Sequence, residues 1–316
     1  MGDIGVIVNP RSRQMRRDPG RLNRLAQVLG ETGRVVATQS VDEVADRLRE
    51  FRNEGMSILA IHGGDGTIHA TLSVLLGMGT SEPLPTILFL PGGTLNTITT
   101  GLGVRGDPEA LLGAVAEKVR RGEPLPEVER NVLQLEGRSG FIFGNGAVAS
   151  FLEAYYATGH PSRTTAALLL ARTVCSVLVG GRFSREILDP FQGRVVVDGN
   201  PWPPRALVTV TAATVPEIGL GFTPYYRYNE RPDHFALLGI YAGPLALASE
   251  LGRIWRGLPM RPGKCFSAVA KEVRIESDKP FSYVIDGELY KADRELTLRI
   301  GPRLRYIGPF RGSVLS

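Results

Sequence analysis

A buried-strand pattern, a glycine-rich turn and a helix pattern follow one another within twelve residues. The apolar run at residues 58–61 ends in Gly63-Gly64-Asp65-Gly66-Thr67, and helical spacing begins at Ile68. Glycines allow a tight turn and a close approach of the backbone to a ligand, and a helix N-terminus favours an anion. The string therefore predicts a phosphate-binding turn, with a plain packing turn as the alternative. A carboxylate beside phosphates, as at Asp65, indicates either a bridging metal ion or a chemical role.

Strand and helix signals alternate through the first 130 residues or so. We expect strands at residues 4–8, 34–38, 58–61 and 86–90, and helices at residues 19–29, 41–51, 68–76, 96–102 and 108–121. This alternation is typical of a parallel sheet that helices cover on both faces. Ligands of such folds bind at the carboxyl ends of the strands.

The pattern changes after a linker-like stretch at residues 121–126. Short strands separated by Gly, Pro and Asp turns follow, with helical inserts expected near residues 161–180 and 244–256. The sequence thus predicts an α/β domain at residues 1–127 and a mainly antiparallel β domain at residues 128–302. Two domains also agree with a length of 316 residues.

Composition excludes several classes of protein. The net charge of +5 permits anionic partners but does not require them, and no basic stripe with interleaved aromatics indicates nucleic acid. Two cysteines and four histidines form neither a disulfide framework nor a zinc set. No signal peptide is expected, and the apolar stretch at residues 164–181 is shorter than the ~20 residues of a transmembrane helix. We expect a buried helix there, with a helix at a membrane surface as the alternative.

Three polar loops follow three of the expected strands. They are Asn9-Pro10-x-Ser12, the glycine loop, and Gly92-Gly93-Thr94-x-Asn96; Thr38 ends the remaining strand. Asn9, Thr67, Thr94 and Asn96 could supply neutral donors and acceptors for a nucleotide, although Thr67 and Asn96 are also credible helix caps. The sequence has no Walker A string, and no G-x-G-x-x-G string follows the first strand, which disfavours P-loop ATPases and ordinary dinucleotide dehydrogenases.

A pair of carboxylates surrounds a glycine in Ile285-Asp286-Gly287-Glu288. Asp-Gly is a strong hairpin signal, so spacing alone predicts a turn. Phosphoryl transfer to a hydroxyl also requires a carboxylate that orients or deprotonates the acceptor. If the first domain holds ATP, the second domain would meet the acceptor across a cleft.

These strings, in this order and rough spacing, resemble the diacylglycerol kinase catalytic family, which includes bacterial lipid kinases and sphingosine kinases. The resemblance covers nearly the whole chain. It implies an α/β nucleotide-binding domain like those of NAD kinases and phosphofructokinases, followed by a β-sandwich lipid domain. It also implies that residues 303–316 return to the first domain.

The resemblance further implies roles for individual residues. Asp65 would act through Mg²⁺ or on the acceptor hydroxyl, and Asp286 or Glu288 would be the general base. Asp233 would hold a structural Mg²⁺, although His234 stands where the family usually has glycine. The residues that would contact ATP are Asn9, Pro10, Ser12, Thr38, Gly63, Gly64, Asp65, Gly66, Thr67, Ile68, His69, Gly93, Thr94 and Asn96.

Two positions depart from the family pattern. Thr97 stands where many bacterial members have an aspartate, so a carboxylate that could help Mg²⁺ or the acceptor is absent. His69 replaces a frequent asparagine and could make activity sensitive to pH.

The resulting expectation is an ATP- and Mg²⁺-dependent lipid kinase of phospholipid metabolism, cytoplasmic and peripherally associated with the membrane. Its partner would be a lipid substrate at the membrane surface and not nucleic acid. The sequence leaves open whether the protein forms a homodimer. The segments at residues 151–156 and 166–179 would receive acyl chains, touch the bilayer, or form core. The alternatives are an NAD kinase-like enzyme and a nucleotide-binding regulator without catalysis.

Overall fold

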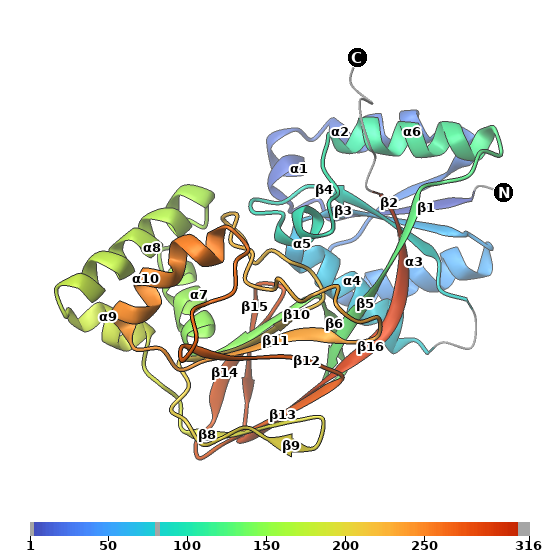
Figure 1. The fold of residues 1–316 in the computed structure, drawn as a ribbon. Coiled ribbons are helices and arrows are strands. Elements are labelled where there is room, and N and C mark those ends of the chain that lie inside the picture. The colour runs from blue at the N-terminus through green and yellow to red at the C-terminus, as the bar shows by residue number, and fades with distance from the viewer. Residues whose placement is uncertain (1–2, 80–82, 309–316) are drawn as a thin grey trace. The chain divides into compact units, whose positions relative to one another are not determined.

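The computed structural model describes residues 3–79 and 83–308, and these form two compact units. Unit 1 comprises residues 1–130 together with residues 303–316, and unit 2 comprises residues 131–302. Of the C-terminal segment predicted to return to the first domain, residues 309–316 lie outside the described residues. Figure 1 shows the elements of both units.

Unit 1 is built on a parallel sheet with the strand order β2-β1-β3-β4. The strands are β1 (Ile4–Val8), β2 (Gly33–Ala37), β3 (Ile58–Gly63) and β4 (Thr86–Pro91). Every residue of β1, β3 and β4 is buried, as expected of central strands covered on both faces. Val8 pairs with His62, and His62 pairs with Leu90, so the three strands end at the same edge.

Helices cover both faces of this sheet (Figure 1), with α2 packed on α6 and α3 on α4. Their starts follow local chemistry: Ser40 caps α3 through the N–H of Glu43, and Asp107 caps α6 through the N–H groups of Glu109 and Ala110. The helices are α1 (Arg13–Arg17), α2 (Arg21–Leu29), α3 (Val41–Asn53), α4 (Asp65–Gly77), α5 (Thr97–Gly101) and α6 (Pro108–Arg120), with a 3₁₀ turn at Gly30–Thr32.

The last described strand, β16 (Glu295–Ile307), brings its C-terminal end into unit 1. Tyr306 of this strand pairs in parallel with Ile87 of β4. The Tyr306 hydroxyl donates a hydrogen bond to the Leu102 carbonyl at 3.1 Å and is buried. Residues 303–308 therefore belong to the nucleotide-type fold of unit 1.

Unit 2 is a β-sandwich, which confirms the predicted antiparallel architecture. One sheet has the order β12-β11-β10-β7-β14-β15, and the other contains β16-β13-β8-β9 with β5 and β6. The strands are β5 (Glu127–Leu135), β6 (Arg138–Gly140), β7 (Ile142–Asn145), β8 (Gly193–Val197), β9 (Asn200–Pro201), β10 (Thr209–Ala213), β11 (Phe235–Ile240), β12 (Cys265–Ala270), β13 (Glu272–Ser277), β14 (Phe281–Ile285) and β15 (Glu288–Ala292).

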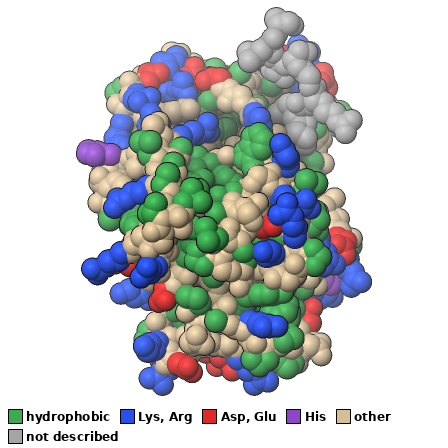
Figure 2. Space-filling view, turned by 60° about the vertical axis from the view of Figure 1, so that its left-hand side comes forward, with side chains coloured by type: hydrophobic (Ala, Val, Ile, Leu, Met, Phe, Trp, Pro, Cys, Tyr) green, Lys and Arg blue, Asp and Glu red, His purple; other side chains and the backbone are tan. Residues whose placement is uncertain are grey.

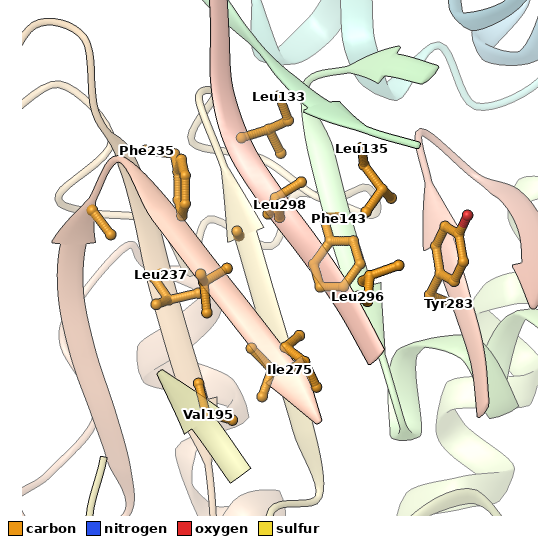
Figure 3. Close-up of a cluster of buried hydrophobic side chains, with 14 of the residues drawn as sticks. Leu133, Leu135, Phe143, Val195, Phe235, Leu237, Ile275, Tyr283, Leu296 and Leu298 are labelled. Carbon is orange, nitrogen blue, oxygen red and sulfur yellow. The ribbon is translucent and has the colours of Figure 1, made fainter. Parts of the chain in front are cut away.

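Apolar side chains from both sheets form the core of the sandwich, as Figure 3 shows. Phe143 and Phe235 come from one sheet, and Leu133, Ile275 and Leu298 from the other. Along β13, Val273 and Ile275 are fully buried while their neighbours are only partly buried, which is the period-2 alternation of a one-sided sheet.

Unit 2 also contains the helices α7 (Ala147–Ala157), α8 (Arg163–Leu178), α9 (Arg182–Ile187) and α10 (Pro244–Trp255). The expectation that residues 164–181 form a buried helix is wrong for half of its surface. Ala166, Leu169 and Val177 are buried, but Leu168 is 66% and Leu178 68% exposed. Within residues 3–79 and 83–308, no helix is long and apolar enough to cross a membrane.

Candidate nucleotide site

The loops after β1, β3 and β4 meet at the common edge of the sheet in unit 1. We call residues 9–12, 63–67 and 92–97 the three-loop site. The Asn9 N–H donates to the His62 carbonyl at 3.1 Å, and the Gly92 N–H donates to the Gly63 carbonyl at 2.8 Å. The Gln14 N–H donates to the Gly92 carbonyl at 3.3 Å. Parallel strands of matched length thus bring together residues that are far apart in the sequence.

Two pairs of glycines allow the second and third loops to touch. A Cβ added at Gly93 would lie 2.5 Å from the Gly64 Cα, and one added at Gly92 would lie 2.9 Å from the His62 ring. A Cβ at Gly63 would meet the Thr67 side chain at 2.5 Å. Packing of one loop against the other therefore requires these glycines, as the alternative of a packing turn expects, and phosphate binding at the turn stays a prediction.

Asp65 joins the second loop to α5. Its Oδ2 accepts a hydrogen bond from the Thr97 N–H, and its Oδ1 accepts one from the Ile98 N–H, both at 3.0 Å. Asp65 is itself the first residue of α4, and Gly64 is its N-cap. A carboxylate at the N-terminus of two helices is favoured by both dipoles. Sequence reasoning missed this anchoring role, although a short helix at Thr97 without an acidic residue in its first turn was a usable signal.

Asn9 and Thr67 connect the first loop to the second. The Asn9 Nδ2 donates to the Thr67 Oγ1 at 2.9 Å, and the Asn9 Oδ1 accepts from the Arg11 N–H at 2.8 Å. The prediction of Thr67 as a helix cap is wrong, because α4 begins two residues earlier. Asn96 occupies the N-cap position of α5 in the left-handed region, yet its Oδ1 accepts from the Gly93 N–H at 2.9 Å and does not cap the helix.

The other predicted contacts differ in accessibility. Pro10, Gly66, Gly93 and Thr94 are half-buried. Ser12 and Thr38 are buried beside the loop, and the Ser12 hydroxyl has no hydrogen-bond partner among the described residues. Ile68 and His69 are 1% and 3% exposed, so their side chains belong to the packed interior of unit 1.

The first loop leads into a basic segment. Arg11 and the α1 residues Arg13, Arg16 and Arg17 carry positive charge, and no acidic residue lies between Asn9 and Arg17. Such a segment beside glycine-rich turns and the N-terminus of a 13-residue helix produces a positive potential. The electrostatics of the three-loop site therefore suit an anionic ligand.

His62 is a buried titratable residue that sequence reasoning did not identify. It is the fifth residue of β3, it is 0% exposed, and neither ring nitrogen has a hydrogen-bond partner within the described part of the chain. Burial, together with the positive charge of Arg21, lowers the pKa of His62 to about 4. The imidazole beneath the glycine loops is thus neutral at physiological pH.

In unit 2, the Asp286-Gly287-Glu288 string forms the turn between β14 and β15, as its spacing predicts. Asp286 is 4% exposed, and its carboxylate accepts hydrogen bonds from the Phe141 and Ile142 N–H groups at 2.9 Å. The Tyr156 hydroxyl of α7 donates to the Gly287 carbonyl at 2.8 Å. Glu288 is half-buried. Asp286 therefore holds the turn in place, and Glu288 is the more accessible of the two carboxylates.

Metal ligands are sparse. Among residues 3–79 and 83–308, no three His, Cys, Asp or Glu side chains form a group that could hold a metal ion, and this includes the surroundings of Asp233. Asp233 lies in the loop before β11 with a φ of 56°. Mg²⁺ commonly binds to one or two carboxylates together with substrate phosphates. Asp65 could be one such carboxylate beside the phosphates of a nucleotide. The described residues do not form a Mg²⁺ site from protein ligands alone.

Comparisons with known proteins agree with this geometry. Residues 3–124 match the family model of the diacylglycerol kinase catalytic domain. No curated protein matches the sequence.

Solved structures share the fold over almost the whole chain. A diacylglycerol kinase from Bacillus anthracis str. Sterne has a TM-score of 0.68 at 15% identity, with 98% of this chain and 97% of that chain covered. A further structure from the same organism has a TM-score of 0.73 at 17% identity and covers 98% of this chain and 95% of its own.

Yeast NADH kinase, solved with NADH, has a TM-score of 0.51 at 11% identity and covers 98% of this chain and 84% of its own. These likenesses show the fold, namely the α/β unit and the β-sandwich. With the sequence match, they make residues 3–124 similar to a diacylglycerol kinase catalytic domain in both sequence and fold.

Proposed function

We propose that the protein is an ATP-dependent kinase that phosphorylates a hydroxyl group of diacylglycerol or a related lipid. The convergence of three polar loops at the N-terminus of α4, within the stretch that matches the kinase family, is the observation that carries the proposal. Backbone N–H groups and a helix dipole bind phosphates without a Walker A lysine.

In this proposal, unit 1 binds the nucleotide. The phosphates lie against the glycines at residues 63–64 and 92–93, and the arginines after Asn9 offset their charge. Mg²⁺, when bound with ATP, neutralises charge that develops on the phosphates, and Asp65 would be its protein ligand. The two hydrogen bonds that Asp65 accepts from α5 fix the position of this carboxylate.

Unit 2 supplies the group that activates the acceptor. We infer that this group is Glu288, because the Asp286 carboxylate is buried and holds the backbone of residues 141–142. The Glu288 carboxylate takes the proton of the acceptor hydroxyl as its oxygen attacks the γ-phosphorus. The bond from that phosphorus to the β–γ bridging oxygen breaks, ADP leaves, and the proton is later released to water.

An acceptor panel tests the proposal. The protein is incubated with ATP labelled at the γ-phosphate, Mg²⁺, and either diacylglycerol, another hydroxyl-bearing lipid, or NAD. Label in a lipid phosphomonoester is the expected result. Label in NADP would instead indicate an NAD kinase-like enzyme. ATP binding without transfer to any acceptor would indicate a regulator.

A further inference from the structure

The exposed face of α8 has the composition of a protein interior. Its outward residues recur at helical spacing and are almost all apolar or small: Thr164, Ala167, Leu168, Ala171, Arg172, Cys175 and Leu178. A surface helix normally carries polar side chains on this face. The inward face of α8, with Ala166, Leu169, Thr173 and Val177, is no more apolar than the outward face. Folding of unit 2 therefore leaves an apolar helix surface in water.

Helix α10 packs beside α8 and extends this surface. Leu245 is 62% and Trp255 56% exposed on α10, and Val179, directly after α8, is 82% exposed. Figure 2, which brings the side of α8 and α10 forward, shows green apolar side chains gathered there with blue cationic ones among them. We call the exposed side chains of residues 163–179 and 244–256 the α8–α10 face.

The charge of the α8–α10 face has one sign. Residues 163–179 contain no Asp or Glu but include Arg163 and Arg172, whereas Arg182, just beyond them, pairs with Glu186 at 2.7 Å. The one acid of α10, Glu250, is 0% exposed and pairs with Arg253 and Arg261 at 3.6 and 3.1 Å. An occupant of this face must therefore offer apolar groups together with negative charge.

We propose that the α8–α10 face docks on an anionic lipid bilayer, with its leucines and Trp255 in the acyl–headgroup boundary and its arginines among the headgroups. Exposed apolar helices with Arg on their flanks and Trp at the margin bind in this way. A second copy of the chain fits less well, because a two-fold interface would place arginines against arginines without an acidic partner. The proposal specifies how the kinase proposed above would reach a lipid substrate, and in that sense it rests on the proposed function.

Co-sedimentation with vesicles tests the docking without reference to phosphate transfer. The full chain is mixed with vesicles of phosphatidylcholine alone or with phosphatidylglycerol added, without ATP and without any phosphorylatable lipid. We expect binding to the anionic vesicles that weakens with salt. Arg163→Gln should weaken it about fivefold, the loss expected for one interfacial charge.

The double variant Leu168→Glu with Leu178→Glu should weaken vesicle binding about tenfold or more, because both leucines would enter the bilayer boundary. Val41→Glu is the matched control, since Val41 is a 56% exposed apolar residue at the start of α3 in unit 1. It should bind vesicles as the wild type does. Equal binding by the double variant and the wild type would overturn the proposal.

The fluorescence of Trp255 gives a second measurement. Anionic vesicles should shift the emission to the blue, brominated acyl chains should quench it, and Trp255→Phe should abolish both changes. An unshifted and unquenched spectrum in the presence of anionic vesicles would overturn the proposal. So would a dimer that the double leucine variant converts to a monomer without any change in vesicle binding.

Discussion

The carboxylate of Asp65 accepts a hydrogen bond from the backbone N–H of Thr97 at 3.0 Å. Asp65 lies in the glycine loop after β3, and Thr97 begins the helix after the loop that follows β4. This bond and its neighbour to Ile98 tie two of the three loops together through one side chain. The backbone of Thr97 is thus held by the carboxylate of Asp65.

Removal of the Asp65 carboxylate should affect both stability and chemistry. Asp65→Ala removes two charge-assisted hydrogen bonds and should lower the free energy of unfolding by about 2–3 kcal/mol. ATP-dependent turnover should also fall. Asp107→Ala is the matched control, because Asp107 caps α6 in the same way through two N–H groups. It should reduce stability in urea unfolding yet preserve ATP-dependent turnover; equal turnover in both variants would contradict the chemical role of Asp65.

A methyl group at Gly93 should open the three-loop site. In Gly93→Ala the new Cβ would lie 2.5 Å from the Gly64 Cα, so the second and third loops must separate. We expect ATP affinity, measured by calorimetry, to fall about tenfold or more. Gly77→Ala in α4 serves as the control, since a Cβ there meets no atom within 4 Å. Retained affinity in Gly93→Ala would show that the contact between the loops is dispensable.

His62 should make the protein sensitive to acid. Its pKa in the folded state is about 4, whereas an imidazole in the unfolded chain titrates near 6.5. Between these two pKa values, His62 is protonated in the unfolded state but stays neutral in the folded state. The free energy of unfolding therefore decreases as the pH falls from the higher value to the lower one. From about pH 7 to about pH 5, the wild type should lose about 2 kcal/mol more than His62→Leu in urea unfolding.

An exposed histidine gives the matched control for that experiment. His160→Gln should leave the pH dependence of stability as it is in the wild type. Identical losses of stability in the wild type and His62→Leu would show that His62 is protonated in the folded state.

Substitutions of the two carboxylates in the β14–β15 turn should have different effects, one on stability and the other on turnover. Asp286→Ala leaves the buried N–H of Phe141 and the partly buried N–H of Ile142 without an acceptor and should lower the free energy of unfolding by about 3 kcal/mol. Glu288→Gln keeps the shape of the side chain, so its stability should stay within about 0.5 kcal/mol of the wild type. Turnover should fall about 100-fold, as for a lost general base. Full turnover in Glu288→Gln would assign acceptor activation to Asp286.

Local patterns allowed the sheet and the three loops of unit 1 to be predicted from the sequence. The apolar strand Ile4–Val8 is followed by Asn9, the strand Ile58–Gly63 ends in glycine, and parallel strands bring their carboxyl ends to one edge. A local pattern also predicted the β14–β15 turn, because an Asp-Gly string strongly favours a hairpin turn.

Features that depend on tertiary contacts could not be predicted in this way. The hydrogen-bond partner of Thr67 is Asn9, which lies in another loop and comes near only when the loops assemble. Periodicity placed α8 correctly, but it does not specify which apolar face is covered, so the exposure of Leu168 and Leu178 was missed. The hydrogen bonds from Phe141 and Ile142 to Asp286 span more than 140 residues.

The central claim is that ATP binds to the three-loop site of unit 1. Hydrogen–deuterium exchange, measured with and without ATP and Mg²⁺, locates the ligand directly. We predict slower exchange at residues 9–12, 63–69 and 92–97 in the wild type, and no such protection in Gly93→Ala. Protection confined to other segments, or equal protection in both proteins, would contradict the account.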